Sequence, residues 1–116
     1  MSEVTLFALD GYEERRKEKG CNGCGTGWSA KLIPNTIYFL SIKPSCCIHD
    51  DMYEMGEPTN EAKEKADRVF LNNMIRQIDA YNKWYYPTTL AKRRAYKYYL
   101  AVKHFGGGAY WNGKNK

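Results

Sequence analysis

The stretch TNEAKEKADRVFLNNMIRQIDAY, residues 59 to 81, has the pattern of a long helix with one buried face. Thr59 is a favourable N-cap residue, so we expect the helix from about Asn60 to Tyr81. Its apolar side chains recur at three- and four-residue spacing, the period of one buried helical face. They are Ala66, Phe70, Leu71, Met74, Ile75 and Ile78. This segment predicts a fold of the all-α class.

A carboxylate lies inside this apolar face. Asp67 precedes Leu71 by four residues and Met74 by seven. Burying a charge is costly unless the charge is paired or hydrogen-bonded. We therefore expect Asp67 to meet a His or a Tyr hydroxyl on a facing helix. In the alternative, the face is slightly rotated and Asp67 pairs with Lys63 or Arg68 at its edge.

Helices are also expected on both sides of this segment. Pro44-Ser45 opens one helix, which ends at Met55 before Gly56. Another runs from about Thr89 to Phe105 and places small and aromatic side chains on one face. The residues of that face are Ala91, Ala95, Tyr98, Tyr99 and Val102.

The remaining segments are shorter. Residues 10 to 19 predict a charged helix, and residues 36 to 43 (TIYFLSIK) form either an extended segment or a turn of helix. The two aromatic residues of the tail AYWNGKNK, residues 109 to 116, are expected to pack. His104 ends the last helix, where a cation is favourable against the helix dipole, and we assign it no chemistry.

Length and composition limit the possible classes of protein. The 116 residues (13.5 kDa) suit a single domain over 1–116. With 43% hydrophobic and 15% aromatic residues, a disordered chain is excluded. No stretch approaches the roughly 18 apolar residues of a membrane span, and no secretory signal is visible. A net charge of +5 favours anionic partners, which include nucleic acid, a phospholipid surface and phosphate.

The four cysteines lie close together in sequence. They are Cys21, Cys24, Cys46 and Cys47. They allow three disulfide pairings or one zinc site with four thiolates. Adjacent cysteines are awkward zinc ligands, because structural zinc sites usually separate paired ligands by two or more residues, so disulfides are the preferred interpretation.

Two segments have the chemistry of a hydrolytic site. The alternating glycines of residues 23 to 27 let backbone carbonyls turn inward, which suits a hard cation such as Ca²⁺. On a helix, His49 and Tyr53 share one face while Asp50 lies roughly 100° around it. With Asp67 fixing the imidazole tautomer, His49 would activate water directly, and a cation would polarise a carbonyl.

Three segments, in this order, resemble the phospholipase A2 family. GCGTGW, residues 23 to 28, resembles the calcium loop. CCIHDDMY, residues 46 to 53, resembles the active-site helix, in which a Cys stands three residues before the catalytic His and an Asp follows it. KADRVF, residues 65 to 70, resembles the segment that carries the second Asp. The resemblance covers about residues 21 to 75 and is greatest to the small bacterial, fungal and phage members.

The resemblance implies a fold and catalytic residues. The fold would have two antiparallel helices that carry the His and the Asp, a Gly-rich calcium loop and a C-terminal basic helix. His49 would be the general base, Asp67 would orient it, and Tyr53 would hydrogen-bond to Asp67. The activity would be calcium-dependent hydrolysis of the sn-2 acyl ester of phospholipids.

The resemblance also implies the calcium ligands. Asp50 would supply the side-chain oxygen, and the carbonyls of Gly23, Gly25 and Gly27 would complete the protein's share. The Gly25 N–H would help to form the oxyanion hole. Trp28 departs from the family pattern, because it replaces the last glycine of the loop.

A disulfide between Cys24 and Cys46 is a further implication of the resemblance, which supplies no definite partner for Cys21 or Cys47; a bond between these two is one option. The bond between Cys24 and Cys46 would lower the entropic cost of ordering the glycine loop. Disulfides suggest an extracellular, virion-associated or exported protein.

The partner expected for such an enzyme is a phospholipid membrane surface. The basic aromatic segment of residues 81 to 99 would face an anionic bilayer, with Trp84, Tyr85 and Tyr86 at the interface. We expect a monomer and no nucleic acid. The alternatives are a catalytically silent phospholipase-like module that serves assembly or binding, and a four-Cys zinc module that binds nucleic acid.

Overall fold

The computed structural model describes residues 6–19, 36–81, 83–105 and 110–111. Within these residues the elements follow the order α1 (Tyr12–Lys19), β1 (Thr36–Ile37), β2 (Leu40–Ser41), α2 (Lys43–Met55), α3 (Asn60–Ala80) and α4 (Thr88–Phe105). The all-α class is confirmed, and the strands form only a two-residue pairing.

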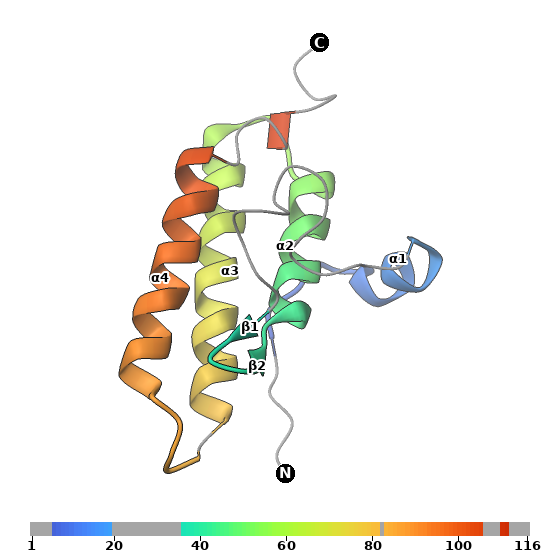
Figure 1. Cartoon of the computed structure of the whole chain (residues 1–116). Helices are drawn as coiled ribbons and strands as arrows, with labels where there is room; N and C mark the ends of the chain where they lie inside the picture. The colour runs from blue at the N-terminus through green and yellow to red at the C-terminus, as the bar shows by residue number, and fades with distance from the viewer. Residues whose placement is uncertain (1–5, 20–35, 82, 106–109, 112–116) are drawn as a thin grey trace.

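The three longer helices of the described chain lie side by side and alternate in direction (Figure 1). α3 packs against both α2 and α4. The side chain of Thr59 accepts a hydrogen bond from the Ala62 N–H at 3.1 Å, as expected of an N-cap. The turn between α2 and α3 is short, so residues on the two helices face each other across a narrow interface.

The buried face of α3 is the centre of the core. Ala66, Phe70, Met74 and Ile78 are fully buried there, whereas Leu71 and Ile75 are half-buried at its edge. The predicted face of α4 is buried at all five positions, which are Ala91, Ala95, Tyr98, Tyr99 and Val102. In the tail, Tyr110 is fully buried and Trp111 half-buried, so the prediction that the aromatic residues pack is confirmed.

Residues 36 to 41 form a tight hairpin, which resolves the ambiguity of this segment. Thr36 pairs with Ser41, and Ile37 with Leu40. The two turn residues, Tyr38 and Phe39, have φ angles of 46° and 73°. Such positive φ values are typical of two-residue hairpin turns but are usually adopted by Asn or Gly. The absence of those residues explains why the sequence carried no hairpin signal.

The short helix α1 lies apart from the bundle on the side of α2 (Figure 1). Arg15 joins it to α2 through a bidentate ion pair, in which Nε lies 2.7 Å and Nη2 2.8 Å from the two carboxylate oxygens of Asp51. No helix in the described ranges is long and apolar enough to span a bilayer.

Candidate active site

The carboxylate of Asp67 is the centre of the candidate site. It is 1% exposed and lies between α3 and α2. Its Oδ1 is 2.9 Å from Nε2 of His49 and accepts a hydrogen bond of 2.6 Å from the Tyr53 hydroxyl. The expectation that a His and a Tyr on a facing helix meet Asp67 is therefore confirmed.

One part of the alternative interpretation is also found. Lys63 donates from Nζ to the other oxygen of Asp67, Oδ2, at 2.8 Å. Arg68 instead contacts Glu64 at 2.6 Å on the exposed side of α3. The structure thus surrounds Asp67 with His49, Tyr53 and Lys63 together.

Lys63 has a role that the sequence did not predict. Besides Asp67, its ammonium contacts the backbone carbonyl of Val102 at 3.1 Å and that of Lys103 at 3.4 Å, both in the last turn of α4. A cation is favourable at this end of a helix. Lys63 therefore connects the buried carboxylate to α4. The sequence indicated its contact with Asp67, as the alternative interpretation, but not its contacts with α4.

Hydrogen bonds determine the charge state of Asp67. Burial alone would raise the pKa of the Asp67 carboxyl, but the hydrogen bonds from His49, Lys63 and Tyr53 outweigh it and hold this pKa below its usual value. Burial, together with the adjacent Asp67 charge, raises the pKa of Tyr53. Asp67 is thus an anion at neutral pH, and Tyr53 is a neutral donor.

His49 is held on three sides. Its ring stacks on Phe70, with centroids 4.6 Å apart, and makes a tilted contact of 4.2 Å with Tyr53. Asp67 contacts Nε2, and Nδ1 makes no hydrogen bond within the described part of the chain. With Nε2 in contact with Asp67, Nδ1 is the ring nitrogen left without a hydrogen bond to the described residues. It is therefore the nitrogen at which this imidazole can accept a proton.

Asp50 and Asp51 are adjacent but differ in their partners. Asp51 is bound by Arg15, as described above, whereas Asp50 forms no ion pair with the described residues. Although Asp50 has an exposed surface, the surrounding protein partly desolvates it, which raises the pKa of its carboxyl to about 6, and nearby His49 opposes this rise. A carboxylate that is desolvated without a cation beside it has the chemistry of a ligand for a hard cation.

The proposed loop ligands lie outside the described residues. These ligands are Gly23, Gly25 and Gly27, and the residues Cys21, Cys24 and Trp28 lie outside the described part of the chain as well. In the described ranges, no three His, Cys, Asp or Glu side chains gather to hold a metal. The same ranges contain no free cysteine. The pairing of Cys24 with Cys46 stays a prediction.

One expectation about the aromatic segment is wrong. Tyr86, placed at a membrane interface from the sequence, is only 7% exposed, and its hydroxyl donates to the carbonyl of Ile37 at 2.7 Å. This hydrogen bond turns the ring inward, against the hairpin. Trp84 and Tyr85 are exposed, at 95% and 60%.

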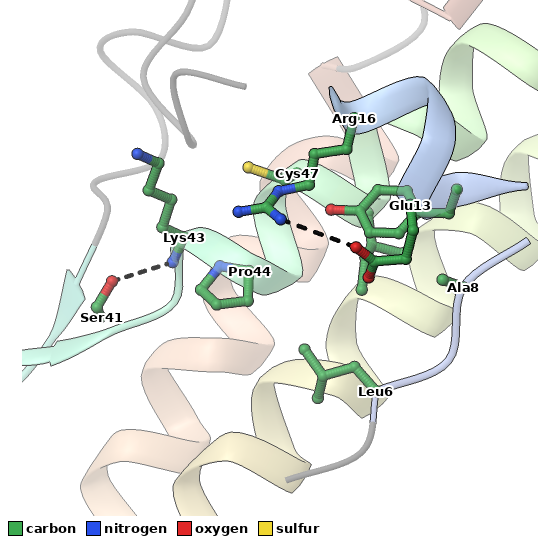
Figure 2. A pocket seen from close by; sticks show the side chains of 10 residues that line it. Leu6, Ala8, Glu13, Arg16, Ser41, Lys43, Pro44 and Cys47 are labelled. Atoms are coloured by element: carbon green, nitrogen blue, oxygen red, sulfur yellow. Dashed lines mark hydrogen bonds and ion pairs between the residues drawn. The ribbon is translucent and has the colours of Figure 1, made fainter. Parts of the chain in front are cut away.

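A cavity of about 540 Å³ lies between the N-terminal segment and the start of α2 (Figure 2). Leu6, Pro44 and Ile48 give it apolar walls, and Arg16 and Lys43 add cations. Arg16 is directed toward Glu13, 3.9 Å away (Figure 2). His49 does not line this cavity, so we assign no catalytic step to it.

Comparison with known proteins gives one partial likeness. The chain is similar to Conodipine-P3 from Conus purpurascens, with 35% identity over 69 residues. The matched segment is 60% of this chain and 34% of that protein, so the chain spans about a third of the length of this relative. No family model matches the chain, and no solved structure matches it.

Proposed function

We propose that this chain is a calcium-dependent phospholipase A2, which hydrolyses the sn-2 acyl ester of phospholipids. The observation that carries the proposal is the buried contact of 2.9 Å between His49 Nε2 and Asp67 Oδ1, with Nδ1 making no hydrogen bond to the described residues. The order of the three segments that resemble the family supports it, and so does the partial likeness to Conodipine-P3. The proposal includes a phospholipase A2-like arrangement of α2 and α3.

In the proposed reaction, Nδ1 of His49 takes a proton from a water molecule while the water oxygen attacks the ester carbonyl carbon. The tetrahedral intermediate then collapses, and the His49 imidazolium returns the proton to the departing alkoxide. The products are a fatty acid and a lysophospholipid. Asp67 holds the proton on Nε2 in the resting state and stabilises the imidazolium that forms.

Tyr53 and Lys63 position Asp67 in this scheme. Each donates to a different oxygen of the carboxylate, so Asp67 is held by two donors besides His49. Fixing the carboxylate in this way fixes the imidazole plane that it contacts. The contribution of both residues is therefore geometric and electrostatic, and neither accepts the water proton.

Calcium would be held by Asp50 and by the carbonyls of Gly23, Gly25 and Gly27. When bound, it would polarise the ester carbonyl and offset the negative charge on its oxygen. Asp50 fits this role, because it is an oxygen donor next to His49 with no cation paired to it among the described residues. The Gly25 N–H would donate to the same oxygen. A disulfide from Cys24 to Cys46 would join the loop to α2.

The partner in this proposal is a phospholipid membrane surface, on which the protein acts as a monomer. Binding to nucleic acid is not part of it. With disulfides, the protein would work outside the cell or as an exported or virion-associated component.

The test is release of fatty acid from phospholipid vesicles in the presence of calcium. We expect His49→Gln to lower the rate by at least about a thousandfold, because the general base is lost. His104→Gln is the matched control, since the other histidine is exposed and makes no hydrogen bond or ion pair with Asp67, and it should retain full activity. EDTA should abolish the reaction.

Two results would point to the alternatives. Calcium binding without any hydrolysis would indicate a catalytically silent phospholipase-like module. One tightly held zinc ion in protein purified without reducing agent would indicate a four-Cys zinc module. Equal hydrolysis in EDTA would contradict the proposed dependence on calcium.

A further inference from the structure

Fully exposed aromatic side chains project from two loops at one end of the helix bundle. Phe39, at the tip of the hairpin, is 98% exposed, and Trp84, between α3 and α4, is 95% exposed. In Figure 1 the loop between α3 and α4 forms the lower end of the bundle, and the hairpin lies above it beside the lower turns of α3. The hydrogen bond from Tyr86 to Ile37 joins them directly. We call Phe39, Trp84 and Tyr85 the aromatic end.

The backbone of the hairpin shows that this exposure has a cost. Tyr38 and Phe39 both have positive φ, a conformation that disfavours bulky side chains. The ring of Tyr38 regains contact with the protein, because the guanidinium of Arg94 lies 4.8 Å from its centroid. Phe39 is almost wholly exposed to solvent, so nothing in the described chain offsets the cost of its conformation.

The excess of positive charge lies in the loop that carries Trp84 and in α4, which follows it. Residues 81 to 105 contain six Lys and Arg and no Asp or Glu, whereas the rest of the chain has twelve Lys and Arg against thirteen Asp and Glu. Among the described residues, Lys92 pairs with Asp79. Lys83, Arg93 and Lys97 are exposed and form no ion pair there. The aromatic end therefore has one unpaired cation, Lys83, directly beside Trp84, while Arg93 and Lys97 lie further along α4.

We propose that the aromatic end docks on an anionic phospholipid bilayer, with Phe39 and Trp84 entering the interfacial region and Lys83 contacting lipid phosphates. Aromatic side chains favour that region, and lysine is attracted to anionic lipid. Protruding side chains suit a soft surface that needs no complementary groove, and Phe39 offers a nucleic acid no hydrogen bond. The choice of a phospholipid bilayer as the partner rests on the proposed function. The choice of the docking surface rests on the exposure of Phe39 and Trp84 and on the charge of Lys83.

The experiment measures sedimentation with vesicles of phosphatidylglycerol and phosphatidylcholine in EDTA, in a His49→Gln background that prevents hydrolysis. We expect Phe39→Asn with Trp84→Ser to weaken partitioning into phosphatidylglycerol vesicles at least tenfold. Phe105→Ser is the matched control, because Phe105 is 68% exposed at the opposite end of α4, and it should change partitioning less than twofold. Phe39→Asn alone should raise the melting temperature, since Asn tolerates positive φ.

The same double variant, with His49 intact, separates this proposal from the proposed function. It should hydrolyse a short-chain phospholipid below its micellar concentration at the wild-type rate. If that hydrolysis is absent in the wild type while the vesicle result holds, only the enzymatic proposal fails. Unchanged partitioning of the double variant, equal partitioning into pure phosphatidylcholine, or an equal loss in Phe105→Ser would overturn the docking proposal. Binding to duplex DNA that depends on Phe39 and Trp84 would also overturn it.

Discussion

Asp67 shows how a single buried charge is stabilised by the residues around it. Its two oxygens together meet an imidazole nitrogen, a phenol hydroxyl and an ammonium group, at 2.6 to 2.9 Å. Removing one partner from such a cluster lowers the stability of the fold more than replacing the whole cluster with apolar residues, because the remaining charge stays buried. The free energy of unfolding therefore depends in part on residues around Asp67 that take no part in proton transfer.

The first prediction concerns Lys63, whose side chain is 12% exposed. We expect Lys63→Met to lower the free energy of unfolding by about 2 kcal/mol, since it removes charged hydrogen bonds to Asp67 and to the end of α4. Urea denaturation measures this change. Lys65→Met is the control, because Lys65 lies on the exposed side of the same helix. Equal losses in the two variants would show that the contact with Asp67 contributes nothing.

At this scale the sequence predicted some partners and not others. The position of Asp67 within an apolar face was sufficient to predict its burial and its need for a His or Tyr. The contacts of Lys63 with α4 depend on where α4 ends in space, which spacing within α3 cannot give. The inward turn of Tyr86 likewise depends on the hairpin, so it could not be separated from Trp84 and Tyr85 by sequence.

At the scale of elements, the close approach of Tyr110 to the turn between α2 and α3 fixes the geometry of the two helices that carry His49 and Asp67. The hydroxyl of Tyr110 donates to the carbonyl of Glu57 at 2.5 Å. A Cβ atom at Gly56 would lie 2.5 Å from that hydroxyl and 2.8 Å from the backbone oxygen of Met52. Gly56 is needed here for space, since its φ of −67° is open to any residue.

We therefore predict that Gly56→Ala destabilises the protein by about 1–3 kcal/mol, the usual cost of overpacking. Thermal unfolding followed by circular dichroism measures the loss. In a Tyr110→Phe background one clash is removed but the contact with the Met52 carbonyl remains, so a smaller cost should persist. A substitution that leaves stability unchanged in both backgrounds would mean that the turn can move away from Tyr110 freely.

Tyr86 gives a second prediction at this scale, because it joins the hairpin to the start of α4. Burial, followed by the nearby Tyr81, raises the pKa of Tyr86 to about 12, from the usual value of about 10. A raised pKa means that the neutral hydroxyl is the form the fold favours. Its stabilisation is fully present below pH 10 and is lost as the pH rises through about 12.

We expect Tyr86→Phe to cost about 1 kcal/mol at neutral pH, through loss of the hydrogen bond to Ile37. The variant should also lose less stability than the wild type between pH 10 and 12. Urea denaturation at pH 8, 10 and 11.5 measures both effects, with Tyr96→Phe as the exposed control. Parallel loss of stability in wild type and Tyr86→Phe would contradict the assignment of the alkaline transition to this hydroxyl.

At the scale of the whole molecule, the order of the helices was predictable from sequence, whereas the contacts of the helices with the hairpin and the tail were not. Caps, proline and glycine positions gave the bounds of α2, α3 and α4 closely, because these signals are local. The hairpin and the docking of Tyr110 on the turn before α3 arise from contacts between distant segments. The same limit applies to charge, since the sequence gives the total of +5 but only the fold shows that Lys92 pairs with Asp79 while Arg93 and Lys97 form no ion pair with the described residues.

The last prediction uses the two adjacent carboxylates of α2 to test calcium binding in the whole protein. A ligand that binds only the folded state stabilises it, by about 2.7 kcal/mol at a hundred times its Kd. We expect calcium to raise the melting temperature of the wild type and EDTA to reverse the shift. Asp50→Asn should abolish the response, because it removes the only side-chain ligand in the proposed set.

Asp51→Asn is the matched control for that experiment, since it removes the same charge one residue away. It should retain the calcium response, although its own melting temperature falls through the weakened ion pair with Arg15. If both variants lost the response equally, calcium binding would depend only on the total negative charge of α2 and not on Asp50 as a ligand. If Asp50→Asn kept the response, the calcium would be bound elsewhere, and the proposed role of Asp50 next to His49 would be wrong.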